Sequence, residues 1–413
     1  MSKIRIKTSK NFNGTVTLPL DKSISQRAAI LDIPMNSGIV GKDIDVTRSA
    51  CEKALIQGEE NLYLGNSGTG IRLLTGYLSG IGKKYVLKGD ESLSNRPMSR
   101  VSDPLNEFGA KITLNNGKPP IEIMPSELKS SFSYILPIPS AQLKSSLLFA
   151  ALNAKKKIEI IEPVLSRDHT ERMLSFLGCD IEIDNGNNFR KITLDGSVPF
   201  EKKEIFVPGD FSSASFFIAL AILSESSAVF IPNVGINPSR IAFIEILKKM
   251  NADIVLENIR EKNNEQFADI KVCSSKLQGV NVPKSLIPNL IDEIPLLSVL
   301  SAFSVGQTSF EGLAELRFKE SDRLKAIISL LKKIQAYFHL KNNDLTILGC
   351  GHDHVFSKGN FNSFNDHRIA MCAAILSSRC AQEVSINDIT SVETSFPNFF
   401  ENLANLGFTI ETK

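Results

Sequence analysis

An eight-residue leucine pattern repeats along this chain of 413 residues. It begins with leucine, has apolar residues at its fourth and eighth positions, and has glycine, asparagine or glutamine at its fifth position. The copies begin at Leu105, Leu174, Leu247, Leu331 and Leu403, at spacings of 69, 73, 84 and 72 residues. Each copy predicts an amphipathic helix, a left-handed cap and a strand, because glycine and asparagine adopt positive φ at little cost.

A second series of short polar stretches interleaves with the first, and each stretch opens a helix of small and apolar residues. They begin near Lys22, Asn66, Ser140, Asp210, Asp292 and Asp366. Together the two series predict six copies of a mixed helix and strand unit of about 70 residues that bury a shared core.

The helix starts also suggest a chemistry. Ser, Asp and Asn are favoured N-caps, and a helix N-terminus presents free N–H groups and the positive end of the helix dipole. Several starts that meet in one cleft would bind an anion. The alternative remains that every helix needs a cap and that the six starts do not converge.

Overall charge and composition exclude several classes of protein. The 47 basic and 45 acidic residues leave a net charge of +2, too balanced for a general nucleic-acid or membrane binder. The longest apolar run, Phe216 to Leu223, is far shorter than the ~20 residues of a membrane span. Residues 1–7 alternate charge with isoleucine, so we expect no secretory signal. The six cysteines form no C-x-x-C pair, which is typical of reduced thiols in a cytoplasmic protein.

Basic residues occur at helix starts, where they oppose the helix dipole and need a compensating anion. Two examples are Lys22-Ser-Ile-Ser-Gln-Arg27 and the glycine-rich Gly65-Asn-Ser-Gly-Thr-Gly-Ile-Arg72. The full set is Lys22, Arg27, Arg72, Arg96, Lys319, Arg323 and Arg368. Each alone could be a solvated basic turn, but jointly they predict a substrate with several negative charges.

Two carboxylates stand beside these cations. Asp292 is either an N-cap or a general base, since a carboxylate near basic residues stays ionised. Glu320 lies in the charge run 317–323, which is either a solvated face or a place where Glu320 carries a proton. Within that run we expect Lys319, Asp322 and Arg323 on one side of a helix. The stretch Cys350-Gly-His-Asp-His354 could suggest zinc, but without a second ligand pair we expect a hairpin and no metal.

In order and identity these motifs resemble the enolpyruvyltransferase family, and within it the 5-enolpyruvylshikimate-3-phosphate synthases (3-phosphoshikimate 1-carboxyvinyltransferases). The resemblance covers nearly the whole chain. It rests on Lys22-Ser-x-Ser-x-Arg27, Gly65-Asn-Ser-Gly-Thr-x-x-Arg72, Arg96-Pro, Ser140-x-Gln142, Gly209-Asp-x-Ser-Ser-Ala214, Asp292, Lys319-Glu-Ser-Asp-Arg323 and Asp366-His-Arg-x-Ala-Met371.

The resemblance implies an α/β fold of two domains, each built from three βαβαββ units with helices inside and sheets outside. One domain would be discontinuous, with residues 1–19 and 233–413, and the other would span residues 20–232. The chain would return to the first domain around Pro232-Asn-Val-Gly235. Closure of the two domains would form the active-site cleft and exclude water.

The implied reaction joins the enolpyruvyl group of phosphoenolpyruvate to the 5-hydroxyl of shikimate 3-phosphate and releases phosphate. Asp292 would take the hydroxyl proton, Glu320 would protonate the methylene carbon, and Lys22 would touch both substrates. The implied contacts of shikimate 3-phosphate are Lys22, Ser23, Arg27, Ser140, Ala141, Gln142, Ser166, Asp292 and Lys319. Those of phosphoenolpyruvate are Lys22, Asn66, Gly68, Arg96, Gln142, Arg323, His367 and Arg368. No metal, organic cofactor, nucleic acid or membrane is implied, and a monomer is expected.

The chain departs from the family pattern at three places. Thr394-Ser395 stand where many relatives carry a lysine that contacts phosphoenolpyruvate, Glu315 replaces an asparagine of some members, and the segment 41–45 is unusual. Two other functions compete with this interpretation. The sister reaction on UDP-N-acetylglucosamine is disfavoured because residues 90–98 contain no cysteine, and a non-catalytic anion binder would not need Asp292 and Glu320.

Overall fold

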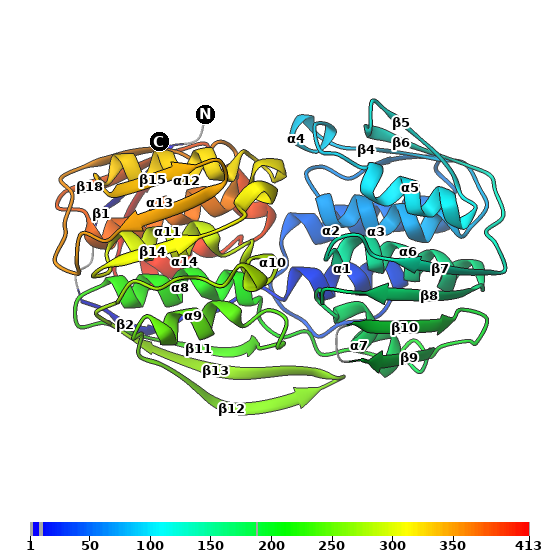
Figure 1. The fold of residues 1–413 in the computed structure, drawn as a ribbon, viewed down its shortest axis with the longest axis horizontal. Coiled ribbons are helices and arrows are strands. Elements are labelled where there is room, and N and C mark those ends of the chain that lie inside the picture. The colour runs from blue at the N-terminus through cyan, green and yellow to red at the C-terminus, as the bar shows by residue number, and fades with distance from the viewer. Residues whose placement is uncertain (1–2, 8–10, 187–188, 413) are drawn as a thin grey trace.

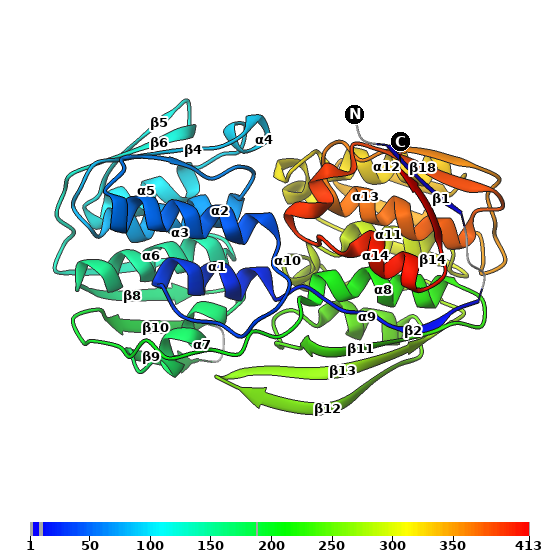
Figure 2. The ribbon, with the colours of Figure 1, turned by 180° about the vertical axis from the view of Figure 1, so that it is seen from behind.

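The computed structural model describes residues 3–7, 11–186 and 189–412. Residues 1–2 of the charged start, and residues 8–10, 187–188 and 413 of the predicted domains, lie outside the described residues. The chain forms two lobes side by side, and both chain ends lie on the same lobe (Figures 1 and 2). We call residues 20–207, which share one buried cluster, the central lobe. Residues 4–16 and 211–408 share the other cluster and define the terminal lobe.

The central lobe has three inner helices, α1 (Lys22–Leu31), α3 (Gly68–Ser79) and α6 (Ala141–Ala154). Its other helices are α2 (Lys42–Glu52), the π-helix η1 (Lys53–Gln57), α4 (Glu91–Ser94), α5 (Ser99–Phe108) and α7 (His169–Phe176). One sheet has the order β3-β4-β6-β5, with β3 (Asn61–Tyr63), β4 (Tyr85–Lys88), β5 (Lys111–Asn115) and β6 (Lys118–Met124). The other has the order β7-β8-β10-β9, with β7 (Ser131–Ile135), β8 (Lys157–Glu162), β9 (Asp180–Asn185) and β10 (Arg190–Asp195).

The terminal lobe repeats this plan with inner helices α8 (Phe211–Leu223), α11 (Ile294–Ala302) and α13 (His367–Ile375). Its other helices are α9 (Ala242–Lys249), α10 (Ile287–Leu290), α12 (Arg323–Lys333), α14 (Phe399–Asn405) and the 3₁₀ turns η2 (Lys284–Leu286), η3 (Leu313–Phe318), η4 (Leu376–Arg379) and η5 (Ile389–Thr394). The sheet orders are β12-β13-β11-β2, β14-β16-β15 and β17-β18-β1-β19. The strands are β1 (Lys3–Lys7), β2 (Asn13–Thr15), β11 (Ala228–Gly235), β12 (Ile254–Lys262), β13 (Glu265–Cys273), β14 (Gln307–Phe310), β15 (Tyr337–Lys341), β16 (Asp344–Leu348), β17 (Gly359–Asn362), β18 (Glu383–Asn387) and β19 (Thr409–Thr412).

The predicted internal repeat is confirmed by the sheets. In four of the sheets that the described residues form, a parallel pair (β3 with β4, β7 with β8, β2 with β11, β17 with β18) is followed by antiparallel neighbours. Two units have only isolated parallel bridges in place of this pair: Met35 with Ile205 in the unit of α1 and α2, and Gln278 with Val305 and Asn281 with Ser309 in the unit of α11 and α12. The α/β fold of repeated units is therefore confirmed, and the parallel strand pair is reduced to bridges in these two units.

The caps predicted by the leucine pattern are also confirmed. Gly109, Gly178, Asn251, Gln335 and Gly407 have φ values of 118°, 81°, 69°, 59° and 91°. Each residue therefore takes the left-handed conformation in which a helix ends and the chain turns back into a strand.

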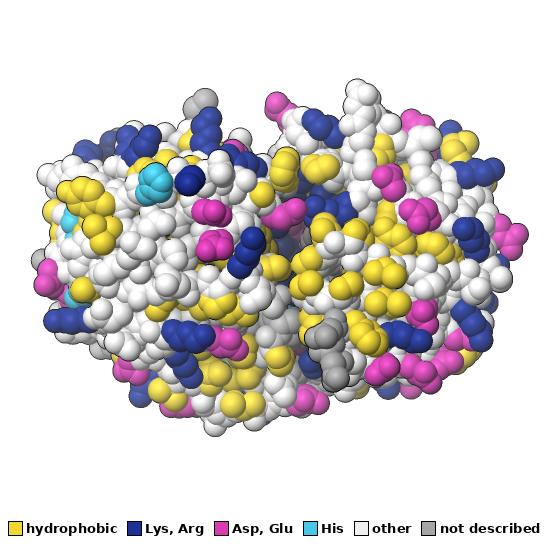
Figure 3. Space-filling model, viewed as in Figure 1, with side chains coloured by type: hydrophobic (Ala, Val, Ile, Leu, Met, Phe, Trp, Pro, Cys, Tyr) yellow, Lys and Arg dark blue, Asp and Glu magenta, His cyan; other side chains and the backbone are white. Residues whose placement is uncertain are grey.

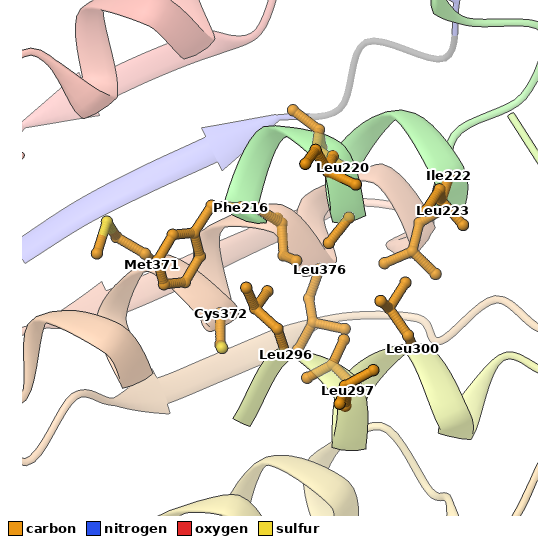
Figure 4. Packing of buried hydrophobic residues seen from close by; sticks show 14 of the residues in the cluster. Phe216, Leu220, Ile222, Leu223, Leu296, Leu297, Leu300, Met371, Cys372 and Leu376 are labelled. Carbon is orange, nitrogen blue, oxygen red and sulfur yellow. The ribbon is translucent and has the colours of Figure 1, made fainter. Parts of the chain in front are cut away.

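Packing of the inner helices explains why they are apolar on all sides. Every residue of α8 is buried, and Phe216 and Leu220 of α8 belong to the same buried cluster as Leu297 of α11 and Met371 of α13 (Figure 4). A fully buried leucine contributes about 1.5–3 kcal/mol to stability. A helix held in this way is rigid, so side chains at its N-terminus are placed accurately.

The chain crosses between the lobes at two adjacent segments, residues 16–21 and 207–211. Leu20 and Gly209 form a bridge, the Asp21 N–H donates to Pro208 O at 2.8 Å, and the Asp210 N–H donates to Pro19 O at 2.9 Å. The expected return near residue 233 is therefore displaced toward residue 209. The reason is that β11 lies between β2 and β13, so residues 211–232 pack in the terminal lobe.

Among the described residues, no single helix combines the length and the apolar composition needed to cross a membrane. A pair of helical segments, Lys284–Leu290 and Ile294–Ala302, meets those two criteria only when joined across a bend of 113°.

Candidate active site

The starts of the inner helices carry capping side chains at five of the six predicted positions. Asp21, Ser67, Ser140, Asp210 and Asp366 accept hydrogen bonds from the backbone N–H groups of Ile24, Gly70, Leu143, Ser213 and Arg368. The sixth helix, α11, begins after Glu293 without a side-chain cap. Asp292 is therefore not the N-cap that its simplest interpretation predicts, and its carboxylate is free to pair with other groups.

Helix starts from the two lobes meet across the crossing segments. The Lys22 N–H at the start of α1 donates to Asp210 Oδ2 at the start of α8, at 3.2 Å. Arg240 joins the same two starts, because it donates to Asp21 Oδ2 at 3.3 Å and to Ser212 Oγ at 2.7 Å. The predicted convergence of helix starts is therefore present between α1 and α8.

Asp292 lies at the centre of a cluster of arginines. Arg167 of the central lobe donates to its Oδ2 at 2.9 Å, and Arg323 donates to its Oδ1 at 3.3 Å. Arg368 Nη2 lies 3.8 Å from Oδ2. Burial opposes ionisation of Asp292, but Arg368, Arg167 and the neighbouring cations together hold its pKa well below the ordinary value. Asp292 is thus an ionised carboxylate that can accept a proton.

Glu320 forms a second carboxylate centre around the same arginine. It makes a close ion pair with Arg323 Nη2, and its Oε1 lies 3.4 Å from Arg96 Nη1 of the central lobe. Burial again favours the neutral acid, but Arg323 and Arg96 hold the pKa of Glu320 well below the ordinary value. Arg323 is only 1% exposed and also donates to Asp366 Oδ2 at 2.8 Å. One buried guanidinium therefore links Asp292, Glu320 and the start of α13.

Lys22 and His367 lie near the Glu320 carboxylate, and of the two only Lys22 carries a positive charge at pH 7. The Lys22 ammonium pairs with Asp43 Oδ2 at 3.1 Å. His367 is buried at the start of α13, and its Nε2 has no hydrogen-bond partner. Burial and then Lys22 hold the pKa of His367 well below its usual 6.5, so the imidazole is neutral at pH 7.

This low pKa predicts a pH-dependent stability. Below about pH 6.5 the unfolded chain protonates this histidine whereas the folded chain does not, so the folded state loses stability as the pH falls. Relative to a His367→Gln variant, the wild-type free energy of unfolding should fall by up to about 1.4 kcal/mol per pH unit below that point. Denaturant titrations at several pH values would measure the difference between the two proteins. A difference that stays constant between pH 7.5 and 5 would contradict the neutral imidazole.

The glycine-rich turn and its neighbours surround the guanidinium of Arg96. Arg96 donates to Asn66 Oδ1 at 2.6 Å, and a Cβ added at Gly68 would clash with Arg96 Nη1. Gln142, in the first turn of α6, donates to Thr69 Oγ1 at 2.9 Å. Ser140 and Ala141 stand at the start of the same helix. The structure thus gathers Asn66, Gly68, Arg96 and Gln142 around one point of the central lobe.

Arg27 is buried in the central lobe among neutral acceptors. It donates to Thr170 Oγ1 at 2.6 Å, Ser23 O at 2.7 Å and Ser145 Oγ at 2.8 Å. Burial lowers its pKa to about 10, so it remains charged at pH 7. The predicted group of Ser23 and Arg27 is therefore brought together. The predicted Ser166 uses its hydroxyl proton to donate to Glu162 Oε1 at 2.6 Å.

Two sequence expectations about nearby motifs are wrong. Lys319, Asp322 and Arg323 do not lie on one helical face, because Lys319 ends η3 in an extended conformation and Asp322 caps α12. The hairpin expected at residues 350–354 does not form, because the flanking strands β16 and β17 belong to different sheets, and His354 Nε2 lies 2.9 Å from Ile334 O. Within the described ranges, no group of three or more His, Cys, Asp or Glu side chains is arranged to hold a metal ion.

Several contacts in and around the site were not indicated by the sequence. Arg167 follows Ser166, which the resemblance did indicate, but nothing in the sequence indicated the contact of Arg167 with Asp292. The unusual segment 41–45 supplies Asp43 to Lys22, and Lys42 pairs with Glu393 beside Thr394. Glu315 binds Arg100 through both carboxylate oxygens, at 3.0 and 3.3 Å. The Lys42–Glu393 and Arg100–Glu315 pairs join the two lobes, whereas Lys22 and Asp43 both belong to the central lobe.

The space-filling view agrees with this placement. Lys and Arg side chains gather in the hollow between the two lobes, with acidic side chains beside them (Figure 3). Behind this surface, the charged groups that meet between the lobes are the cations Arg96, Arg323, Arg368 and Lys319 and the carboxylates Asp292 and Glu320. The arrangement suits a reaction between polyanions that requires a base and an acid.

Comparisons with known proteins agree with the fold and the site. The family model described as EPSP synthase (3-phosphoshikimate 1-carboxyvinyltransferase) matches residues 38–403. The chain is 39% identical to the 3-phosphoshikimate 1-carboxyvinyltransferase of Thermoanaerobacter sp. (strain X514), over 96% of this chain and 98% of that protein. It is 38% identical to the protein of the same name from Petrotoga mobilis, over 97% and 98%.

Solved structures extend the likeness to three dimensions. The EPSP synthase of Acinetobacter baumannii superposes with a TM-score of 0.85 at 36% identity and covers 100% of both chains. The enolpyruvyl transferase NikO from Streptomyces tendae, at 15% identity and a TM-score of 0.77, shares the fold. The family model matches most of the chain, and these EPSP synthases are more than a third identical to it over nearly its whole length. This chain therefore belongs to the EPSP synthase (3-phosphoshikimate 1-carboxyvinyltransferase) family.

Proposed function

We propose that this chain transfers the enolpyruvyl group of phosphoenolpyruvate to the 5-hydroxyl of shikimate 3-phosphate and releases phosphate. The observation that carries the proposal is the pair of carboxylates, Asp292 and Glu320, that share Arg323 and each meet a further arginine of the other lobe. A non-catalytic anion binder would need the arginines but not two carboxylates placed among them.

The cations overcome the repulsion between two anionic substrates. Phosphoenolpyruvate is assigned to Lys22, Asn66, Gly68, Arg96, Gln142, Arg323, His367 and Arg368, and shikimate 3-phosphate to Lys22, Ser23, Arg27, Ser140, Ala141, Gln142, Ser166, Asp292 and Lys319. Fixed positive groups stabilise charge without reorganisation in a site that excludes water. Holding both substrates in contact also makes the bimolecular step effectively unimolecular.

Asp292 acts as the base in this scheme. Its ionised carboxylate takes the proton of the 5-hydroxyl as the oxygen attacks the central carbon of the enolpyruvyl group. Arg323 and Arg368 hold the carboxylate in place through its own oxygens and, for Arg368, through Asp292 O at 3.1 Å. The carboxylate is therefore oriented as well as ionised.

Glu320 acts as the acid, and substrate charge prepares it for this role. Arg323 and Arg96 are the cations that keep its pKa low. When the anionic groups of phosphoenolpyruvate neutralise these arginines, the pKa of Glu320 rises and the carboxyl can take up a proton. It then protonates the methylene carbon, and the alkoxide adds to the cationic centre to form a tetrahedral intermediate. Transfer of one proton of the resulting methyl group to Glu320, and departure of phosphate, protonated by Asp292, complete the transfer.

The two lobes serve as the two domains of this enzyme, with their boundary at the crossing segments rather than at residue 233. Arg96 contacts Glu320 and Arg167 contacts Asp292, each in the opposite lobe. These contacts form when the two lobes close, so the closed form is the active one. One copy of the chain contains every assigned group, so a monomer suffices. All six cysteines are free thiols, which fits the proposed cytoplasmic location.

Phosphate release tests the proposal directly. The purified protein should release phosphate from phosphoenolpyruvate when shikimate 3-phosphate is the acceptor, and not when UDP-N-acetylglucosamine replaces it. Titration calorimetry beside this assay separates an enzyme from a binder. Tight binding of shikimate 3-phosphate without any phosphate release would refute the transferase assignment.

A further inference from the structure

Arg72 lies in the second turn of α3 and holds three separate segments of the site together. Its guanidinium donates to Gly68 O at 3.1 Å, to Gln142 Oε1 at 3.1 Å and to Pro97 O at 3.2 Å. These oxygens belong to the glycine-rich turn, to the start of α6 and to the loop that carries Arg96. All three acceptors are neutral, so the positive charge of Arg72 is not neutralised by them.

The contact with Gln142 decides which end of that amide faces which neighbour. A guanidinium can only donate hydrogen bonds, so Gln142 must turn its carbonyl oxygen toward Arg72. The amide nitrogen then donates to Thr69 Oγ1 at 2.9 Å, which uses one of its two hydrogens. The second N–H remains as a donor. Arg72 therefore fixes Gln142 in the orientation that can donate to an anion.

Arg72 also sits on the tight contact between two inner helices. Ser146 Oγ of α6 donates to Arg72 O at 2.9 Å, and a Cβ added at Gly76, one turn further along α3, would clash with Ser146 O. At the start of α3, a Cβ added at Gly68 would lie 3.3 Å from Arg72 Nη1. The side chain thus forms one wall of the space beside Gly68.

Arg72 remains charged in this position. Burial and then the neighbouring Arg96 and Arg100 lower its pKa to about 10, which still leaves it protonated at pH 7. A lysine would keep that charge, but its single ammonium group cannot reproduce a planar fork aimed at three oxygens. Charge and geometry can therefore be tested separately at this position.

We infer that Arg72 is a positioning residue for enolpyruvyl transfer: it braces the Gly68 turn, the Gln142 amide and the Arg96 loop, and orients an N–H of Gln142 toward phosphoenolpyruvate. The inference rests on the proposed function, which assigns Gly68, Gln142 and Arg96 to that substrate. Arg72 itself acts through these three groups rather than on the reacting atoms.

Steady-state kinetics of Arg72→Lys tests the inference. The variant should raise the KM for phosphoenolpyruvate by about tenfold or more, with a smaller fall in kcat, because the charge stays but the oriented hydrogen bonds are lost. Arg48→Lys is the matched control: Arg48 lies on α2 of the same lobe, its side chain is 53% exposed, and its KM should change by no more than about twofold. An Arg72→Lys enzyme with a KM within about twofold of wild type would overturn the inference, since charge alone would then suffice.

A double variant shows whether Arg72 acts through Gln142. If it does, Arg72→Lys combined with Gln142→Ala should have a KM no more than about twofold above that of Gln142→Ala alone. If the KM of the double variant instead rises by the product of the two single increases, Arg72 does not act through Gln142. Should Arg72→Lys fail to fold, Gln142→Asn tests the same contact, because the shorter amide cannot reach Arg72, and it too should raise the KM about tenfold. An unchanged KM in that variant would count against the inference.

The role of Arg72 and the proposed function can be refuted separately. A wild-type protein without phosphate release would refute the enolpyruvyl transfer itself. An active wild type whose Arg72 and Gln142 variants behave independently would refute only the role of Arg72.

Discussion

Asp292→Asn should bind both substrates and yet turn over about 10²–10⁴-fold more slowly, because the amide cannot take the proton of the attacking hydroxyl. Asn has nearly the same shape, and it removes a negative charge from beside Arg167, Arg323 and Arg368. Binding of anions should therefore be retained or strengthened. Calorimetry with shikimate 3-phosphate and a phosphate-release assay would measure the two effects separately.

Asp322→Asn is the matched control for this prediction. Asp322 caps α12 one residue before Arg323, and Asn is an equally good N-cap, so activity should change by no more than about twofold. A purely structural role for Asp292 would weaken binding and turnover together. Turnover of Asp292→Asn equal to that of wild type would remove Asp292 from the chemistry.

Glu320→Gln should produce a loss of similar size, about 10²–10⁴-fold, because the step that protonates the methylene carbon needs a proton donor. The scheme adds a proton to this carbon and then removes one, so in D₂O the wild-type enzyme should exchange methylene hydrogens for deuterium. NMR spectra of the methylene group would follow that exchange. Glu320→Gln should slow exchange and turnover by the same factor, which loss of substrate binding alone would not predict at saturating substrate.

Glu315→Gln is the control for Glu320. Glu315 is another glutamate at the lobe boundary, but its side chain is 50% exposed and pairs with the half-exposed Arg100. Such a pair is worth little, so the activity of Glu315→Gln should fall by no more than about twofold. Deuterium exchange at the wild-type rate in Glu320→Gln would exclude Glu320 as the acid.

Helix ends and helix caps could be predicted from the sequence, because they depend on interactions between residues close together in the chain. Gly109 and Asn251 end their helices with positive φ because the residue type itself permits that conformation. Asp210 and Asp366 cap helices because a short carboxylate reaches its own backbone N–H groups. Such features depend on neighbours within a few residues, so they can be read without a fold.

Predictions that required two distant segments to be placed were less successful. The return of the chain was expected near residue 233, but β11 pairs with β2, a strand more than 200 residues earlier, and draws that segment into the terminal lobe. The sequence pattern of the α1 and α2 unit likewise does not reveal that only isolated bridges form there.

The sequence by itself determined the repeat, the helix starts, the family and the set of charged residues that the chemistry requires. Only the tertiary structure decided which charges meet: Arg167 with Asp292, Arg96 with Glu320, and Arg72 with Gln142. Composition and spacing reveal which groups exist, but an ion pair or an oriented amide depends on ångström-scale distances between segments from 70 to more than 220 residues apart. Those distances are set by how buried helices pack, and packing is a property of the whole chain.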